Sequence, residues 1–352
     1  MDLFPLARPF TSLIEPETAH RLTIRALRLG LAPRQREPDP ASLAIDLFGL
    51  HFENPVGIAA GFDKNGEVPD AMLALGMGFA EVGTVTPRPQ PGNPRPRVFR
   101  LPLYRAVINR LGFNNEGHEA LKKRLLARRG RPGIVGVNIG ANKDSADRIA
   151  DYEAGIRAFD GLASYFTVNI SSPNTPGLRA LQGKAELAGL VSRVLAARRT
   201  DRVRPTPVLL KIAPDLTAGE LADIADVALA EGLDGLIVSN TTIAREGLVT
   251  GLNANETGGL SGAPLFELST SVLRDMYRLT KGRLPIIGVG GICSGEDAYA
   301  KIRAGASLVQ LYSALAYDGP ALVTRIKRDM AACLAADGFA HLKDAVGADV
   351  KL

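Results

Sequence analysis

The chain has 352 residues, of which 46% are hydrophobic and 22% are charged, so it is long enough for one large α/β barrel or for two ordinary domains. That balance is typical of a soluble globular protein and argues against long disordered or low-complexity stretches. The net charge of +5 suits anionic small molecules or an anionic membrane surface, whereas no basic run is interleaved with aromatic residues, so a nucleic-acid-binding module is not expected.

The spacing of the cysteines and histidines argues against a disulfide-stabilised or a metal-binding protein. Cys293 and Cys333 lie far apart and form neither a disulfide framework nor a CxxC metal motif, which predicts a reducing compartment. No metal spacing links the four histidines, which we interpret as structural: His20, His51, His118 and His341. No apolar run approaches the ~18 residues of a transmembrane helix, and prolines and acidic residues interrupt any signal-peptide core near the N-terminus.

The first helical pattern in chain order is HRLTIRALRLGL (20–31), which follows another apolar stretch at 4–16. Arg21, Arg25 and Arg28 form a basic stripe on this helix, and leucine, isoleucine and alanine cover most of the remaining circumference. Two interpretations stay open at this point. The segment is either an interfacial element that docks on anionic lipid and admits a quinone, or a helix packed on the main domain with a solvated basic face.

Eight short apolar runs then recur, and each ends in glycine or in a polar cluster. They are 55–60, 79–85, 134–140, 165–171, 207–213, 235–240, 285–291 and 308–314. Continuous rather than alternating runs indicate strands that are buried on both faces, as in a parallel sheet covered by helices. Helical patterns fill several of the gaps, at 69–77, 185–199, 218–232 and 295–305.

Strand–helix alternation of this kind predicts an α/β fold, a (β/α)8 TIM barrel with an N-terminal helical extension. The predicted boundaries are an extension over 1–38, a catalytic barrel over 39–340 and a peripheral tail over 341–352. A doubly wound sheet is the competing fold, but it usually has fewer strands, and no GxGxxG turn follows the first strand.

Two gaps, 86–133 and 241–284, are too long for simple crossovers. Long insertions after barrel strands tend to be lids or substrate loops, because the active site of such barrels lies at the carboxyl ends of the strands. We expect the proline-rich stretch 86–97 to be an ordered extended loop, the alternative being a flexible tether.

Polar residues or glycines lie at or just after the end of each predicted strand. They are Lys64, Thr84, Asn138, Asn169, Ser171, Ser172, Lys211, Ser239, Asn240, Gly290, Gly291, Tyr312 and Ser313. A single polar residue at a strand end is usually a turn former or a helix cap. Eight strands that all end in this way predict one site at that end of the barrel.

The last two strand ends are typical of a phosphate site. GVGGICSGED (288–297) places Gly290 and Gly291 at a turn, with Ser294 as the expected cap of the following helix, and LYSAL (311–315) adds Tyr312 and Ser313. A helix-capping turn without a ligand is the alternative for the first segment. Lys211 follows an entirely apolar run, so it needs an anionic partner: either a bound flavin ring edge or a carboxylate such as Asp215.

Several long segments resemble dihydroorotate dehydrogenase, in its quinone-dependent, membrane-associated class. The resemblance covers nearly the whole chain and is carried by AAGFDKNG (59–66), EVGTVTPRPQPGNPRPR (81–97), NRLGFNN (109–115), VNIGANK (137–143), NISSPNTPGLR (169–179), LLKIAPD (209–215), VSNTT (238–242), GGLSGAP (258–264), GVGGI (288–292) and LYSAL (311–315). It implies oxidation of (S)-dihydroorotate to orotate in de novo pyrimidine biosynthesis, with flavin mononucleotide (FMN) as hydride acceptor and a membrane quinone as the final acceptor.

The resemblance also implies roles for individual residues, with Ser172 as the catalytic base. Flavin contacts are implied for Ala60, Gly61, Phe62, Asp63, Lys64, Thr84, Asn138, Asn169, Lys211, Ser239, Gly262, Gly291, Tyr312 and Ser313. Substrate contacts are implied for Lys64, Asn109, Arg110, Leu111, Gly112, Phe113, Asn169, Asn174, Asn240 and Thr241. Asparagine amides present both a donor and an acceptor, which suits the alternating edge of a cyclic urea-imide, and a lysine suits a carboxylate.

Soluble members of the family have cysteine at the position of Ser172, so serine favours the quinone-dependent class. A serine that takes a proton from carbon needs a relay, through water or through a neighbouring hydroxyl such as Thr175. The resemblance favours the lipid-docking interpretation of the N-terminal helix and implies a peripheral location on the cytoplasmic face of a bacterial inner membrane. The alternatives are a soluble-class enzyme using fumarate or NAD and a non-redox barrel that binds a phosphorylated metabolite.

Overall fold

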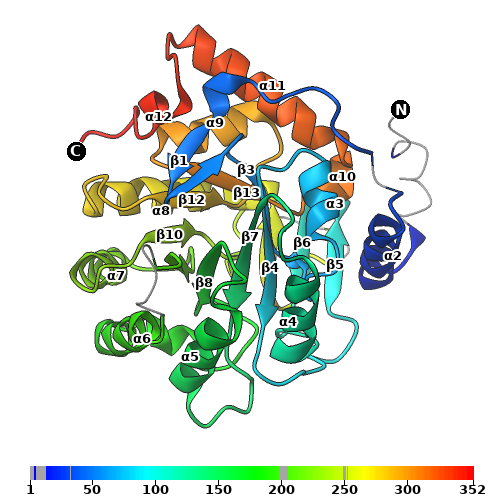
Figure 1. Cartoon of the computed structure of the whole chain (residues 1–352), viewed down its shortest axis with the longest axis vertical. Helices are drawn as coiled ribbons and strands as arrows, with labels where there is room; N and C mark the ends of the chain where they lie inside the picture. Colours follow the sequence, from blue (N-terminus) through cyan, green and yellow to red (C-terminus); the bar gives the residue numbers. More distant parts are fainter. Residues whose placement is uncertain (1–3, 5–12, 32, 199–204, 249–250, 252) are drawn as a thin grey trace.

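Eight parallel strands close into a barrel, as the apolar runs predict (Figure 1). In this computed structural model, residues 4, 13–31, 33–198, 205–248, 251 and 253–352 are described. The barrel strands are β3 (Val56–Asp63), β4 (Phe79–Val85), β7 (Ile134–Ile139), β8 (Tyr165–Asn169), β9 (Val208–Ile212), β10 (Gly235–Val238), β12 (Ile286–Val289) and β13 (Leu308–Leu311). Each of the eight predicted runs contains one of these strands or most of it, so the predicted fold class is confirmed.

Helices form a ring around the strands (Figure 1). They are α3 (Pro69–Ala74), α4 (Gly117–Ala127), α5 (Arg148–Phe159), α6 (Lys184–Ala196), α7 (Ala218–Ala230), α8 (Phe266–Leu279), α9 (Gly295–Arg303), α10 (Leu315–Asp318) and α11 (Ala321–Ala336). The four predicted helical patterns correspond to α3, α6, α7 and α9. Local capping explains where two of them begin: Thr217 and Glu220 form a capping box on α7, and the Ser294 hydroxyl accepts the Asp297 N–H on α9, as expected.

The parallel register brings the predicted polar strand ends to one rim of the barrel. Asn169 at the end of β8 pairs with Lys211 on β9, and Gly83 of β4 pairs with Asn138 on β7. Below this rim every residue of β8, β9, β10, β12 and β13 is buried. A packed interior, in which Glu81 accepts hydrogen bonds from Tyr165 and Gln310, therefore fixes the height at which the rim side chains emerge.

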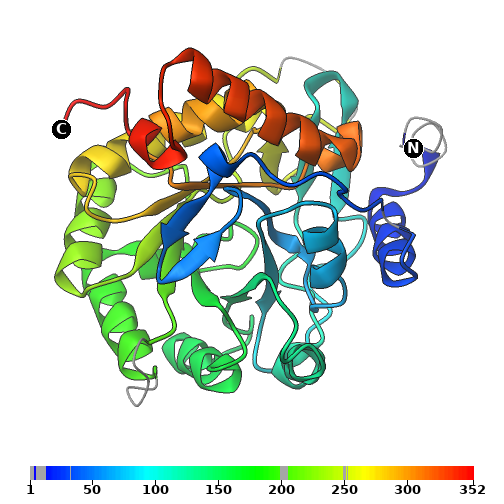
Figure 2. The same cartoon turned by 45° about the horizontal axis from the view of Figure 1, so that its top comes forward.

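The opposite, amino-terminal end of the barrel is closed by a hairpin of β1 (Ile45–Leu47) and β2 (Leu50–Phe52), preceded by the short helix η1 (Ala41–Leu43) (Figure 2). Phe52 packs edge-on against Phe79, the first residue of β4, with ring centroids 5.5 Å apart. The C-terminal segment differs from the expected peripheral tail. It contains α12 (Leu342–Ala345), and both terminal residues of that helix are fully buried, because they pack into the main apolar core.

The two long insertions build one structure together, which the sequence patterns did not reveal. They form a three-stranded antiparallel sheet in which β6 (Ala106–Asn109) lies between β5 (Val98–Leu101) and β11 (Gly259–Gly262). The short helix η2 (Pro102–Tyr104) joins β5 to β6, and η4 (Ala263–Leu265) follows β11. The proline-rich stretch before β5 is ordered, as predicted. Gln90 forms a two-way backbone bridge with Asn115, and the Asn93 N–H donates to Leu111 O.

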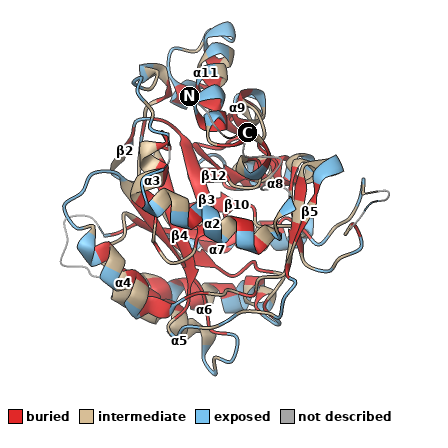
Figure 3. Ribbon diagram, turned by 90° about the vertical axis from the view of Figure 1, so that its right-hand side faces the viewer, coloured by how far each residue is buried: buried red, intermediate tan, exposed pale blue. Residues whose placement is uncertain are grey.

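α2 (Pro16–Arg28) lies at the edge of the molecule beside β5 and begins earlier than the helical pattern suggested (Figures 1 and 3). The buried Glu17 carboxylate fixes it, because it accepts hydrogen bonds from Arg97 at 2.7 Å and from Arg95 at 2.8 Å. None of the helices in the described ranges has the length and apolarity needed to cross a bilayer. Residues 1–3 and 5–12 of the expected extension lie outside the described part of the chain.

Candidate active site

A cavity of about 830 Å³ opens at the carboxyl rim of the barrel and continues outward under α2. Most residues singled out from the sequence line it: Ala60, Gly61, Phe62, Lys64, Thr84, Asn109, Leu111, Gly112, Phe113, Asn169, Ser172, Asn174, Lys211, Ser239, Asn240, Thr241, Gly262, Gly291, Tyr312 and Ser313. These residues lie on or just after seven of the barrel strands, on the two insertions and on the loop that follows β8. A volume of this size is in the range of cofactor and substrate sites.

Three residues of the sequence-based set do not line this cavity. The Asp63 carboxylate turns back to accept the Glu67 and Val68 N–H groups at 2.8 and 2.7 Å, and burial raises its pKa. Arg110 pairs with Glu256 at 2.6 Å and lies over the Phe99 ring. Asn138 is fully buried one layer behind the wall. The side chains of Asp63 and Arg110 therefore serve local structure here.

A chain of amides and hydroxyls crosses the cavity floor. The Asn138 oxygen accepts from the Thr84 hydroxyl at 2.5 Å, and the Asn169 amide donates to the same hydroxyl at 2.9 Å. The Asn240 amide donates to the Asn169 oxygen at 3.3 Å. Each contact fixes which end of an amide is the donor, so the wall presents a defined donor–acceptor pattern to any planar heterocycle.

Lys211 supplies the positive charge of this floor. Its ammonium is buried, it has no hydrogen-bond partner among the residues that the structure describes, and burial lowers its pKa. The carboxylate of Glu81, deeper in the barrel, partly opposes that effect. Asp215, the alternative partner suggested by sequence, is instead paired with Arg179 at 2.9 Å. An unpaired buried cation that lines a cavity fits an anionic or electron-rich ligand.

The loop after β8 carries Ser172, whose side chain is nearly buried and faces the cavity. Its hydroxyl oxygen accepts the Asn174 N–H at 3.3 Å. The preceding hydroxyl, of Ser171, is tied into the floor, because it donates to the Asn169 oxygen at 3.2 Å and accepts from the Asn240 amide at 3.0 Å. The Thr175 hydroxyl is buried and has no partner within the described ranges.

Lys64 and the insertions form the wall opposite this loop. The Lys64 ammonium donates to Gly61 O at 2.8 Å, and burial lowers its pKa to about 8. The Asn174 amide reaches across to the Asn109 oxygen at 3.3 Å, so the loop after β8 touches β6. A cation and several amides thus surround one compartment, as the substrate chemistry inferred from sequence requires.

The turn after β12 contains two glycines in the left-handed region of backbone conformation. Gly290 and Gly291 have φ of 114° and 78°, and a Cβ on Gly291 would collide with the backbone of Phe266. Bare backbone therefore lines this part of the cavity. The Ser313 hydroxyl lies 2.7 Å from that of Ser261, a cavity-lining residue that the sequence analysis did not select. Glycine turns, paired hydroxyls and the Lys211 cation together fit a phosphorylated flavin.

His20 is a second residue that sequence reasoning missed. We interpreted it as structural, but it lines the cavity between Phe62 and Tyr312, with ring centroids 5.4 and 6.0 Å away. Burial lowers its pKa to about 3, so it is neutral at physiological pH. Its position at the start of the helical pattern 20–31 gave no signal, because only the folded chain brings α2 against the end of β13.

Comparisons with known proteins agree with this site. The family model described as dihydroorotate dehydrogenase matches residues 42–334. The chain is 84% identical over 352 residues to "Dihydroorotate dehydrogenase (quinone)" of Parvibaculum lavamentivorans, covering all of both chains, and 52% identical to the mitochondrial protein of that name from Oryza sativa subsp. japonica, covering 98% of this chain and 80% of the relative. It resembles the crystal structure of ligand-free DHODH from Eimeria tenella with a TM-score of 0.91 and 42% identity, over 96% of this chain and all of that one.

A model match over most of the barrel and full-length identity to quinone-dependent enzymes lead to one conclusion. The chain belongs to the dihydroorotate dehydrogenase family, in its quinone-dependent class.

Proposed function

We propose that Ser172 is the base in the dihydroorotate oxidation that this quinone-dependent family member catalyses in pyrimidine biosynthesis. The observation that carries the proposal is the position of its hydroxyl. It faces the cavity from a loop that also touches the amide floor, and its recorded hydrogen bond leaves the oxygen's own proton free to move. Oxidation removes a proton from C5 and a hydride from C6, and Ser172 takes the proton.

The proton needs a route onward, because a serine hydroxyl has an unfavourable intrinsic pKa as a base. The buried, unpaired Thr175 hydroxyl three residues away supports a relay from Ser172, directly or through a water molecule. Ser171 is a poorer candidate, since its hydroxyl already bridges Asn169 and Asn240.

FMN is the flavin that the cavity fits. We assign its ring edge to Lys211, its pyrimidine side to the amides of Asn169 and its neighbours, and its phosphate to Gly291, Tyr312 and Ser313. When bound, FMN supplies the hydride acceptor, which no protein side chain can provide. The protein's contribution is a fixed cation and fixed dipoles around the position of the ring.

Substrate binding follows from the opposite wall. Lys64 pairs with the carboxylate of dihydroorotate, and Asn109, Asn174 and Asn240 read the donors and acceptors of its ring. The close approach of the Asn174 amide to the Asn109 oxygen supports this arrangement, because both side chains reach the same compartment.

The quinone enters from the other end of the same cavity. Residues of α2, including Ala19, Thr23 and Leu27, line that end together with His20 and Tyr312, and they are mostly apolar, as a quinone requires. Leu22, Leu29 and Leu31 are exposed beside Arg21 and Arg25, which supports docking of α2 on an anionic lipid surface. We place this peripheral contact on the cytoplasmic face of the inner membrane.

Ser172→Ala tests the proposal. We expect full flavin content and a flavin reduction by dihydroorotate that is slowed roughly 10²–10⁴-fold, the usual share of general base catalysis. Stopped-flow absorbance of the flavin in the absence of quinone measures that step alone. Reduction at the wild-type rate would rule out Ser172 as the base.

A further inference from the structure

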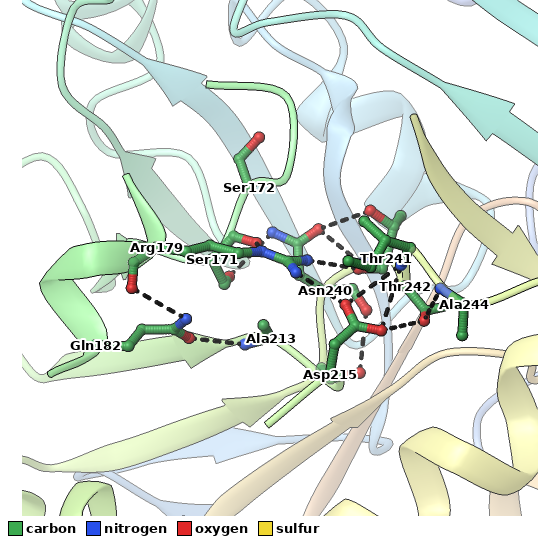
Figure 4. A network of polar contacts seen from close by, with 12 residues as sticks. Ser171, Ser172, Arg179, Gln182, Ala213, Asp215, Asn240, Thr241, Thr242 and Ala244 are labelled. Carbon is green, nitrogen blue, oxygen red and sulfur yellow. Dashed lines mark hydrogen bonds and ion pairs between the residues drawn. The ribbon is translucent and has the colours of Figure 1, made fainter. Parts of the chain in front are cut away.

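Arg179 connects three segments that meet at the active site (Figure 4). It is the first residue of η3 (Arg179–Gln182), in the loop that follows Ser172. Its Nε donates to Ser171 O at 3.1 Å, one terminal nitrogen pairs with Asp215 at 2.9 Å, and the other donates to Thr241 O at 3.3 Å. One guanidinium thus joins the base-carrying loop, the end of β9 and the segment after β10.

Asp215 is itself held firmly. The Thr242 hydroxyl donates to one of its oxygens (Figure 4). The Ile243 N–H lies 3.3 Å from both oxygens. The carboxylate is largely shielded, with a side-chain exposure of 13% against 24% for Arg179. Gln182, at the end of η3, accepts the Ala213 N–H at 3.0 Å, which anchors the loop to β9 a second time.

The position of Ser172 depends on this framework. Ser171 O belongs to the peptide bond that precedes Ser172, so the hydrogen bond from Arg179 orients that peptide. The Ser172 hydroxyl makes its recorded contact only with Asn174 N, on its own loop. No side chain in the described ranges donates to it directly. Its placement against the substrate therefore comes from the backbone, and the backbone is held by Arg179.

We propose that Arg179, fixed by Asp215, is a positioning residue that sets the Ser172 hydroxyl against the substrate and ties this loop to the Thr241 segment. The inference rests on the proposed role of Ser172. Arginine suits the task because its planar fork directs several donors at once, whereas lysine provides a single flexible ammonium.

The test is a double-mutant cycle on flavin reduction. Arg179→Ala should slow stopped-flow flavin reduction by dihydroorotate by about 10²-fold, since a misplacement near 1 Å at a reacting group has an effect of that order. Reoxidation of the reduced flavin by ubiquinone should stay at the wild-type rate, because that half-reaction does not use Ser172. In the Ser172→Ala background, Arg179→Ala should have little further effect.

A matched control and two conservative variants complete the design. Arg198→Ala breaks another partly buried arginine–aspartate pair, with Asp234 at 2.8 Å, at the amino-terminal end of the barrel, and it should leave flavin reduction unchanged. Asp215→Asn preserves the shape of the side chain that holds Arg179 but removes its charge, and it should slow flavin reduction by part of the amount expected for Arg179→Ala. Arg179→Lys should restore only part of the rate.

The outcomes separate this inference from the proposal beneath it. Slow reduction in both single variants and in the double variant at the Ser172→Ala rate would support it. If Ser172→Ala is slow but Arg179→Ala is fast, or if the two defects multiply, the positioning role is refuted while the base survives. If Ser172→Ala reduces its flavin at the wild-type rate, the base assignment itself fails.

Discussion

At the scale of single residues, burial decides the chemistry of the site more than charge counting does. Desolvation lowers the pKa of both Lys64 and Lys211, yet both side chains line a cavity that is suited to anionic or electron-rich groups. A buried lysine of this kind is stabilised in its charged form once its ligand arrives. Most of the residues that matter were visible in the sequence as polar side chains at strand ends.

The low pKa of Lys64 predicts a pH dependence for ligand binding. In the proposed pairing of Lys64 with the substrate carboxylate, only the ammonium form attracts orotate, so affinity should be highest below pH 8 and should fall as the pH rises through about 8. Titration of the bound-flavin spectrum with orotate from pH 6 to 9.5 measures it. Lys64→Met should bind orotate about 10²-fold more weakly and show no inflection near pH 8.

Other residue roles had no sequence signal, for a physical reason. Arg179 acts through Ser171, Asp215 and Thr241, and the separations along the chain are 8, 36 and 62 residues. Periodicity and motif spacing describe neighbours on one element, whereas this contact exists only after three strands have closed into the barrel. His20 is a similar case, since its neighbours belong to β3 and to the turn after β13.

At the scale of elements, the barrel strands were predictable and the insertions were not. Runs such as 285–291 are apolar throughout, so their boundaries follow from composition. β5, β6 and β11 have four residues each, and β11 pairs with a strand 150 residues earlier. Strands that short show too few alternations to be recognised, and nothing local specifies so distant a partner.

The element that most directly predicts a new behaviour is α2. Replacing its exposed Leu22 and Leu29, together with Leu31, by serine should weaken sedimentation with anionic liposomes and slow turnover with a lipid-dissolved quinone. Flavin reduction by dihydroorotate should be unaffected, because none of these leucines is among the proposed flavin or substrate contacts. Leu279→Ser, on α8 at the opposite side of the ring, is the control and should bind liposomes like the wild type.

Equal liposome binding by the triple variant and the wild type would remove α2 from the membrane contact. Deletion of residues 1–35 is a coarser test of the same idea. It also removes Glu17 and so deprives Arg97 of its carboxylate partner, so point substitutions are the cleaner experiment.

At the scale of the whole molecule, stability should depend on a histidine outside the site. His118 lies in the first turn of α4, packs on Phe159 with ring centroids 5.1 Å apart, and has a buried Nε2 with no partner among the described residues. Burial lowers its pKa to about 4, whereas the unfolded chain titrates near 6.5. Between these values the unfolded state binds more protons, so the free energy of unfolding falls with falling pH, by about 1.4 kcal/mol per unit.

His118→Leu should remove this component. Denaturant unfolding at pH 7 and at pH 5 should show a smaller loss of stability for the variant than for the wild type, by about 2 kcal/mol. His341→Leu, at an exposed position, should keep the wild-type difference. An unchanged pH dependence in His118→Leu would assign the acid sensitivity to other groups.

The exposed leucines of α2 also have a practical consequence for anyone who handles the protein. The exposed apolar side chains of Leu22, Leu29 and Leu31 favour association with other apolar surfaces in aqueous buffer. Without lipid or detergent, we expect molecules to associate through these leucines, so that the apparent molecular mass in solution depends on the detergent present. The identity and concentration of the lipid or detergent should therefore be controlled and stated as carefully as pH and salt.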